Sequence, residues 1–312
     1  MGGLALWALA SRAGAQDAPV RILTGFPGGS IVDTMARGLA EALRAQLGRT
    51  VIVESRPGAA GRLAVEAAKQ ARADGDTLLL VPQGPMTLFP QVFGNLRYDP
   101  VKDFIPLSQL ATFDFALGVA PSVPAANLAE LKAWLLRHPA EASFASPGVG
   151  TIPHFLGERY AERIGVKMVH VPFKSAGEMV AAVMGDQVPM AFTPIGDLLE
   201  AARAGRLKIL ATSGSRRAPQ TQQVPTFVES GIDLQISAWL GLYTVAGVPA
   251  ATVARLEAAV VQAIQTPALR SLLSAANMEP AGSTGAELAR TQASETKVWA
   301  EIVKRSGFKP EL

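Results

Sequence analysis

The chain has 312 residues, 49% of them hydrophobic and 18% charged, which is typical of a folded protein of two ordinary domains and excludes a disordered one. The net charge is only +3 and the basic residues are scattered beside just 3 tyrosines, which argues against nucleic-acid binding. The absence of cysteine excludes thiol catalysis, disulfides, cysteine-ligated metals and a lipid-modified cysteine anchor.

The first residues are similar to the second half of a secretory signal peptide. Residues 4–10 form an apolar run that is too short to span a bilayer, and Ala13, Gly14 and Ala15 fit the small-x-small pattern of a cleavage site. We therefore expect residues 1–15 to be the remnant of a signal peptide, and the mature protein to be exported, soluble and not lipid-anchored. A buried first helix is the alternative.

Strand-like and helix-like segments alternate along most of the chain, which is typical of α/β architecture. The first part predicts, in order, strand 20–26, helix 31–47, strand 50–54, helix 63–73 and strand 77–81. The middle predicts strand 115–120, helix 128–137, strand 143–145, a helix from 152, strand 168–173, helix 176–184, strand 189–193, helix 197–204 and strand 208–212. A strand at 240–245 precedes further helical patterns.

Two breaks in the pattern indicate where the chain crosses between domains. Prolines at 121 and 124 interrupt the first apolar run, and Gly247–Val248–Pro249 ends the second. We expect domain I to comprise residues 16–120 and 241–312, and domain II residues 121–240. The hinge crossings then lie near residues 120 and 240, and the first domain is discontinuous.

Two glycine-rich junctions each connect a predicted strand to a predicted helix. The first contains Gly28, Gly29 and Ser30, and the second runs from Ser146 to Thr151. Such a turn leaves backbone N–H groups at the positive end of a helix dipole, where anions bind. The pair therefore predicts a ligand held from two sides by its carboxylate-like groups, whereas glycines that serve only tight turns are the alternative.

Capping residues accompany both junctions. Ser30 and Asp33 have the spacing of a capping box, and Thr151 is a natural cap for the second helix. His154 lies on the first turn of that helix, where it could donate to a carboxylate. Fixing the loop or filling the core is the favoured role for His154.

Enzymatic alternatives lack their usual motifs. Ser146 is not part of a nucleophile elbow, which needs glycine on both sides of the serine. Pro153 stands where a dinucleotide fingerprint needs its third glycine, and no Gly-Lys-Ser/Thr follows either junction. His138 and His170 have no metal-ligand spacing with His154, so we expect neither a metal nor a cofactor.

Two further segments, 82–87 and 192–197, follow buried strands as loops. Open α/β sheets bind ligands outside the carboxyl ends of their strands, so both segments are predicted to border the same crevice. Their candidate binding residues are Pro85 and Thr87 in the first segment and Thr193 and Asp197 in the second. Ordinary turns between strand and helix are the alternative.

A family resemblance extends over residues 20–309, and its motifs follow one another in a characteristic order and spacing. They are Phe26–Ser30 with Asp33, Arg56–Ala59, Tyr98–Phe104, Gly150–Thr151 with His154, and His170–Lys174. These motifs resemble the Bug-type (TctC-like) solute-binding proteins, the extracytoplasmic receptors of tripartite tricarboxylate transport systems.

The resemblance implies a two-domain periplasmic-binding-protein fold (type II, Venus-flytrap) that binds a carboxylate between its domains and catalyses nothing. Carried over residue by residue, it implies ligand-binding roles for Gly28, Gly29, Ser30 and Asp33 on one side and for Ser146, Gly148, Gly150, Thr151 and His154 on the other. Thr193 would contact the far end of the ligand.

The resulting hypothesis is a monomeric periplasmic receptor that captures a small carboxylate and delivers it to the membrane components of a tripartite tricarboxylate-type transporter. One alternative is an α/β enzyme, nucleotide-dependent or hydrolytic, that uses the same cleft. The other is a sensory or scavenging binding protein without a dedicated transporter.

Overall fold

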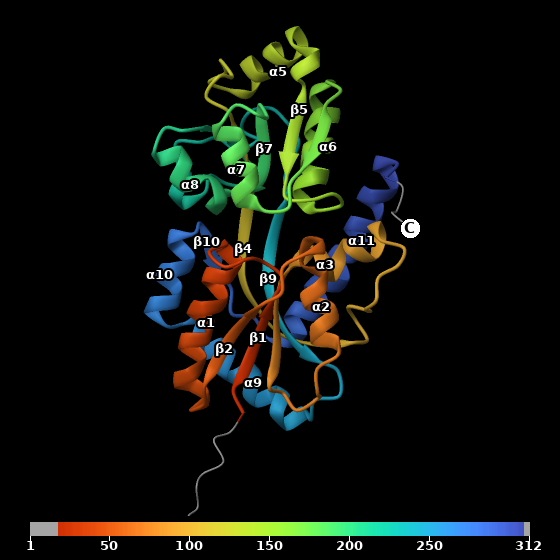
Figure 1. Ribbon diagram of the computed structural model, residues 1–312, viewed down its shortest axis with the longest axis vertical. Coiled ribbons are helices and arrows are strands. Elements are labelled where there is room, and N and C mark those ends of the chain that lie inside the picture. Colours follow the sequence, from red (N-terminus) through yellow and green to blue (C-terminus); the bar gives the residue numbers. More distant parts are fainter. Residues whose placement is uncertain (1–17, 309–312) are drawn as a thin grey trace, which may run out of the picture.

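The computed structural model describes residues 18–308, which form an elongated molecule of two lobes (Figure 1). The predicted signal-peptide remnant, residues 1–15, lies outside the described residues. Over residues 18–308, no helix combines the length and the apolar character needed to cross a membrane.

The first lobe is built on one sheet of mixed direction. Its strands are β1 (Val20–Thr24), β2 (Val51–Ser55), β3 (Thr77–Pro82), β9 (Ser237–Val245), β10 (Met278–Pro280) and the first part of β4 (Phe104–Val119). The order is β2-β1-β3-β9-β4, and β10 also pairs with β4. β1 is parallel to β2 and β3, whereas β9 runs antiparallel between β3 and β4.

Helices cover both faces of this sheet. They are α1 (Ile31–Leu47), α2 (Arg62–Lys69), α3 (Gln83–Thr87), α4 (Phe89–Val92), α9 (Ala250–Ile264), α10 (Pro267–Ala275) and α11 (Gly285–Ser306). Side chains alternate across a strand, so Leu78 and Leu80 of β3 face the core under α1, α9 and α10. Leu79 and Val81 face the smaller cluster under α2, α3 and α11.

The second lobe repeats the α/β pattern on a smaller scale. Its strands are β5 (Ser143–Ser146), β6 (Val169–Pro172), β7 (Met190–Pro194), β8 (Lys208–Thr212) and the last part of β4. Its helices are α5 (Leu128–Arg137), α6 (Ile152–Ile164), α7 (Ala176–Met184) and α8 (Ile195–Arg203). β5 is parallel to β6 and β7, and β4 is antiparallel to β7 and β8.

Strand β4 belongs to both lobes, because its partners change along its length. Residues up to Asp114 pair with β9, and residues from Phe115 onward pair with β7 and β8. Ser213 joins this point to the returning segment: its hydroxyl accepts from the Phe115 N–H at 2.9 Å and donates to the Ile236 carbonyl. The Ile236 N–H also donates to the Ser213 carbonyl, at 2.9 Å. On this pairing the second lobe spans residues 115–236.

Most predicted elements are present, and the differences have local causes. The predicted helix 63–73 ends at Lys69, before a turn in which the Asp76 N–H donates to the Asp74 carboxylate. The predicted strand 115–120 is only the end of β4, whose first part contains Pro106 and polar residues and therefore lacks a continuous apolar run.

The two segments predicted as crevice loops are also different. Residues 83–87 form the short helix α3, so they are not a loop. Segment 192–197 contains no free loop either, because β7 continues to Pro194 and α8 begins at Ile195.

Candidate functional site

The candidate site is the seam where the two lobes meet, because helices of both lobes begin there. Backbone of the second lobe lies directly against the first: a Cβ atom on Gly196 would be 2.3 Å from Cδ1 of Ile31, the first residue of α1. A Cβ atom on Gly150 would be 3.3 Å from atoms of Val92 and Phe93. Glycine therefore permits the approach of the two lobes at these positions.

The first glycine junction is held by Asp33. Ser30 caps α1 as predicted, since its hydroxyl accepts from the Asp33 N–H at 3.2 Å. The second hydrogen bond of a capping box, from the Ser30 N–H to the Asp33 carboxylate, is not formed, so this part of the prediction is wrong. The carboxylate accepts instead from the Gly29 N–H, at 3.1 Å.

Asp33 is buried and also binds Arg37, with N–O distances of 2.8 and 3.1 Å. Burial raises the pKa of this carboxyl, but hydrogen bonds from Arg37 and Gly29 outweigh burial, so the pKa is below its ordinary value. Asp33 therefore shapes the turn as an anion. Nothing lies within 4 Å of a Cβ atom built on Gly28 or Gly29, so the turn itself borders open space.

The second junction is fixed by its own side chains. The Gly150 N–H donates to Nδ1 of His154 at 3.1 Å, which confirms the predicted loop-fixing role of that histidine. The Thr151 hydroxyl donates to the Gly148 carbonyl at 2.8 Å, so the prediction that this side chain caps α6 is wrong. The Gly148 carbonyl, which takes the Thr151 hydroxyl in place of the helix N-terminus, is only three residues before Thr151 in the same turn.

His170 is a residue of the second junction that sequence reasoning did not select. Its ring stacks on His154 with a centroid distance of 3.9 Å, and its Nε2 lies 2.7 Å from the Ser146 hydroxyl. Ser146 is fully buried, so its hydroxyl is enclosed between His170 and the turn. Within residues 18–308 no group of three His, Asp or Glu side chains is arranged to hold a metal ion.

The His170 environment predicts a pH-dependent stability. Burial, and secondly the neighbouring His154, lower the pKa of His170 to about 3. In the unfolded chain the pKa is about 6.5, so between these values the unfolded state binds more protons. The contribution of neutral His170 to the free energy of unfolding is complete above about pH 6.5 and is lost as the pH falls toward 3. We expect a loss of about 1 kcal/mol at pH 5, allowing for the partial exposure of the ring.

Thermal unfolding of His170→Gln between pH 7 and 5 tests this expectation. The variant should show a shallower fall of Tm than the wild type, by about 2–4 °C. His138→Gln is the matched control, because His138 stacks on Trp134 of α5 and has no contact with the junction. A wild-type slope in the His170 variant would contradict the assignment.

The residues predicted in segment 82–87 direct their polar groups into the first lobe. The Thr87 hydroxyl donates to the Gln83 carbonyl at 3.2 Å, and the Pro85 carbonyl accepts from Tyr98 at 2.8 Å. Gln83 itself was not predicted. It is buried, and among the described residues its side-chain oxygen has no hydrogen-bond partner, as is also true of the Thr24 hydroxyl at the end of the adjacent β1. Such orphaned acceptors are candidate ligand contacts.

The segment predicted at 192–197 faces the first junction. Thr193 donates to the Asp197 carboxylate at 2.6 Å, and Asp197 lies in the first turn of α8 beside Gly196, which touches Ile31. Burial raises the pKa of Asp197 to about 6, although the Thr193 hydrogen bond opposes it. Below about pH 6 this carboxyl is mostly protonated and can donate a hydrogen bond to a ligand oxygen, whereas at neutral pH it is mostly ionised.

Ala59 and Ala60 form a strained turn that sequence reasoning treated only as a loop. Both have positive φ values, 48° and 54°, which are unfavourable for residues with a Cβ atom. The Cβ atom of Ala60 lies 3.8 Å from where a Cβ on Gly148 would be. Strain of this kind concentrates at functional sites, and its sequence signal is the Arg-Pro-Gly motif that ends at Gly58.

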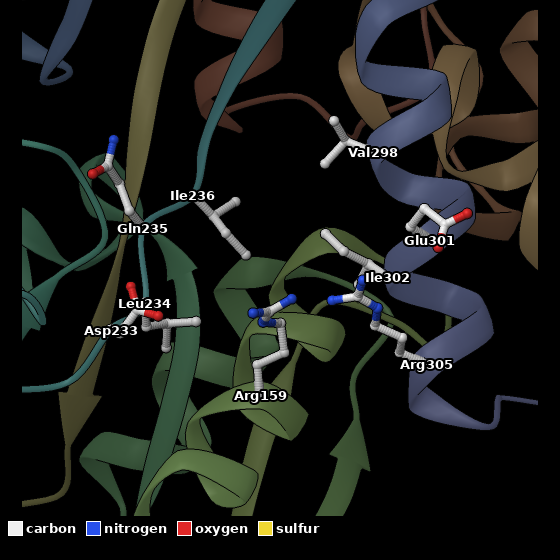
Figure 2. A pocket seen from close by; sticks show the side chains of 9 residues that line it. All are labelled: Arg159, Asp233, Leu234, Gln235, Ile236, Val298, Glu301, Ile302 and Arg305. Carbon is white, nitrogen blue, oxygen red and sulfur yellow. The ribbon is translucent and has the colours of Figure 1, made fainter.

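Two cavities lie away from these residues. One of about 430 Å³ lies between α6 and α11 (Figure 2), and one of about 200 Å³ lies beside Asp114 and Arg216. None of the predicted ligand-binding residues lines either cavity. At the seam itself, the lobes are in direct contact.

Known proteins share this sequence pattern and this fold. A model of the tripartite tricarboxylate transporter family receptor (TctC) matches residues 35–308. Protein BugT of Bordetella pertussis is 29% identical over 293 residues, covering 93% of this chain and 90% of BugT. The periplasmic binding protein BugD is 25% identical with a TM-score of 0.88, covering 94% of this chain and 99% of that one. MatC from Rhodopseudomonas palustris with bound malate is 28% identical with a TM-score of 0.84, covering 91% and 98%.

These similarities confirm the predicted resemblance and the fold class, an α/β periplasmic-binding-protein architecture. They extend over nearly the whole chain, so they concern both lobes and not one motif. The chain therefore belongs to the family of tripartite tricarboxylate transporter receptors, the Bug-type solute-binding proteins.

Proposed function

We propose that this protein is a periplasmic receptor that binds a small carboxylate between its lobes and delivers it to the membrane components of a tripartite transporter. The observation that carries this proposal is that three helices, α1, α6 and α8, begin where the lobes are in contact, α8 against α1 and α6 against the end of α4. Each offers backbone N–H groups that have no partner inside the helix, at the positive end of its dipole. MatC, which has this fold, was solved with malate.

Ligand capture follows from contacts to both lobes. An anion that touches α1 on one side and α6 or α8 on the other stabilises the arrangement in which the lobes meet. Each helix-terminal contact contributes up to about 2 kcal/mol in a partly buried geometry, so a few contacts together with apolar burial support micromolar binding. The segments joined by Ser213 are the hinge about which the lobes would rotate.

The proposed mechanism has no covalent step and needs no cofactor or second copy of the chain. Neutral hydrogen-bonding groups, rather than an activated nucleophile, surround the second junction, since Ser146 is buried and His170 is held neutral. Binding of a nucleotide, which the nucleotide-dependent enzyme alternative requires, is one outcome of the test below.

A thermal-shift screen of the purified protein tests the proposed ligand class. Malate, adipate and citrate, their amides, and nucleotides are each added at increasing concentration. We expect a carboxylate to raise Tm by mass action, with about 2.7 kcal/mol of stabilisation at a concentration of 100 times Kd, and its amide to have no effect. If no carboxylate stabilises the protein, or if a nucleotide does so instead, the proposed function is wrong.

A further inference from the structure

The larger cavity lies between the two lobes, and no residue of the glycine junctions lines it (Figure 2). Helix α6 of the second lobe borders it on one side and helix α11 of the first lobe on the other, and the connecting segment 233–236 borders the rest. Its volume of about 430 Å³ is within the range of small-molecule sites.

Two guanidinium groups point into this space, Arg159 from α6 and Arg305 from α11 (Figure 2). Among the described residues neither of them forms an ion pair. The Nε atom of Arg159 is buried and has no hydrogen-bond partner there. A buried donor without an acceptor among the described residues is a candidate contact for a ligand oxygen.

The carboxylates at the cavity rim do not neutralise these two arginines. Asp233 binds Arg163 at 3.2 Å and its side chain is 91% exposed. Glu301 points away from Arg159 in Figure 2. Two cations from different lobes therefore converge without an ion-pair partner among residues 18–308, an arrangement that an anion between them would stabilise.

Apolar side chains form the remaining wall. Leu234 and Ile236 come from the connecting segment, and Val298 and Ile302 come from α11. Val298 is 53% exposed, so its side chain is accessible to a molecule in the cavity. The cavity thus combines a cationic end with an apolar wall.

We propose that this cavity is a second anion site, for a small organic carboxylate with an apolar body, held by Arg159 and Arg305. The carboxylate accepts hydrogen bonds from both guanidinium groups, and the apolar body covers Ile302 and Val298. Because the two arginines belong to different lobes, occupancy favours the lobe arrangement in which they converge, so the site is coupled to the seam.

Calorimetric titration with hexanoate tests the proposal, with hexanamide as its neutral counterpart and acetate as the anion without an apolar body. The titrations use the wild type, Arg159→Ala, Arg305→Ala and a matched control, Lys304→Ala, the exposed cation next to Arg305. Circular dichroism and Tm verify that each variant is folded.

We expect hexanoate to bind the wild type and Lys304→Ala with similar affinity, and each arginine variant at least tenfold more weakly. Hexanamide and acetate should bind at least tenfold more weakly than hexanoate. Equal binding of hexanamide, or hexanoate binding that both arginine variants keep, would overturn the proposal. The absence of hexanoate binding to the wild type would overturn it as well, without affecting the proposed function.

Discussion

Gly150→Val is expected to weaken binding of the carboxylate identified by the thermal-shift screen at least tenfold. Gly150 has a φ of +72°, a region that is strongly unfavourable for a β-branched residue. Its first side-chain atom would also lie 3.3 Å from atoms of Val92 and Phe93 across the seam. The substitution therefore both distorts the turn at the start of α6 and holds the lobes apart. Calorimetric titration measures the change in Kd.

Gly165→Val is the matched control for backbone strain. Gly165 ends the same helix with a φ of +68°, but nothing lies within 4 Å of a Cβ atom built there. Its substitution is expected to cost about 1–2 kcal/mol of stability and to leave the ligand affinity unchanged. Equal affinity in the two variants would show that the second junction does not hold the ligand.

Gly196→Ala is expected to open the seam and to weaken ligand binding about tenfold or more. The added methyl group would lie 2.3 Å from Cδ1 of Ile31 and 2.6 Å from the carbonyl oxygen of Ala276. The isoleucine side chain can turn aside, but the backbone carbonyl cannot, so the lobes must separate. Overpacking of this kind costs about 1–3 kcal/mol, which here opposes closure and not folding.

Gly177→Ala provides the comparison, because Gly177 is also in the first turn of a second-lobe helix and nothing lies within 4 Å of its added Cβ. Small-angle X-ray scattering with saturating ligand should give a larger radius of gyration for Gly196→Ala than for Gly177→Ala. An identical radius and an identical Kd would mean that the contact between Gly196 and Ile31 is irrelevant to closure.

Local features of the chain made much of the fold predictable. The apolar periodicity of α1, its Ser30 cap and its Gly48 end act within one segment, and the helix has the predicted bounds. Helix α5 and helix α7 also match their predictions, since Asn127 and Ser175 cap them within three residues. Such features depend on neighbours in sequence and can be read without knowing the tertiary structure.

The site was less predictable, because its contacts join residues far apart in the chain. The glycine junctions were found, and segment 192–197, whose Gly196 faces the first junction, was predicted to border the same crevice. The contacts of the second junction with Ala60 and Phe93 were not predicted. His170 has no distinguishing local pattern, and only the pairing of β5 with β6 brings it to Ser146. Asp33 has the spacing of the acidic residue in a capping box, but its short side chain accepts from the Gly29 N–H and not from the Ser30 N–H.

The bonds around Ser213 have a consequence for the ancestry of the molecule. Phe115 and Ile236, the first and last residues of the second lobe, are both bonded to this one serine, so the lobe leaves and rejoins the chain at nearly the same point. A segment with neighbouring ends can be exchanged between homologues without disturbing the rest of the fold. Recombination at these two positions would replace one half of the ligand site while the other half, and the surfaces of the first lobe, are inherited unchanged.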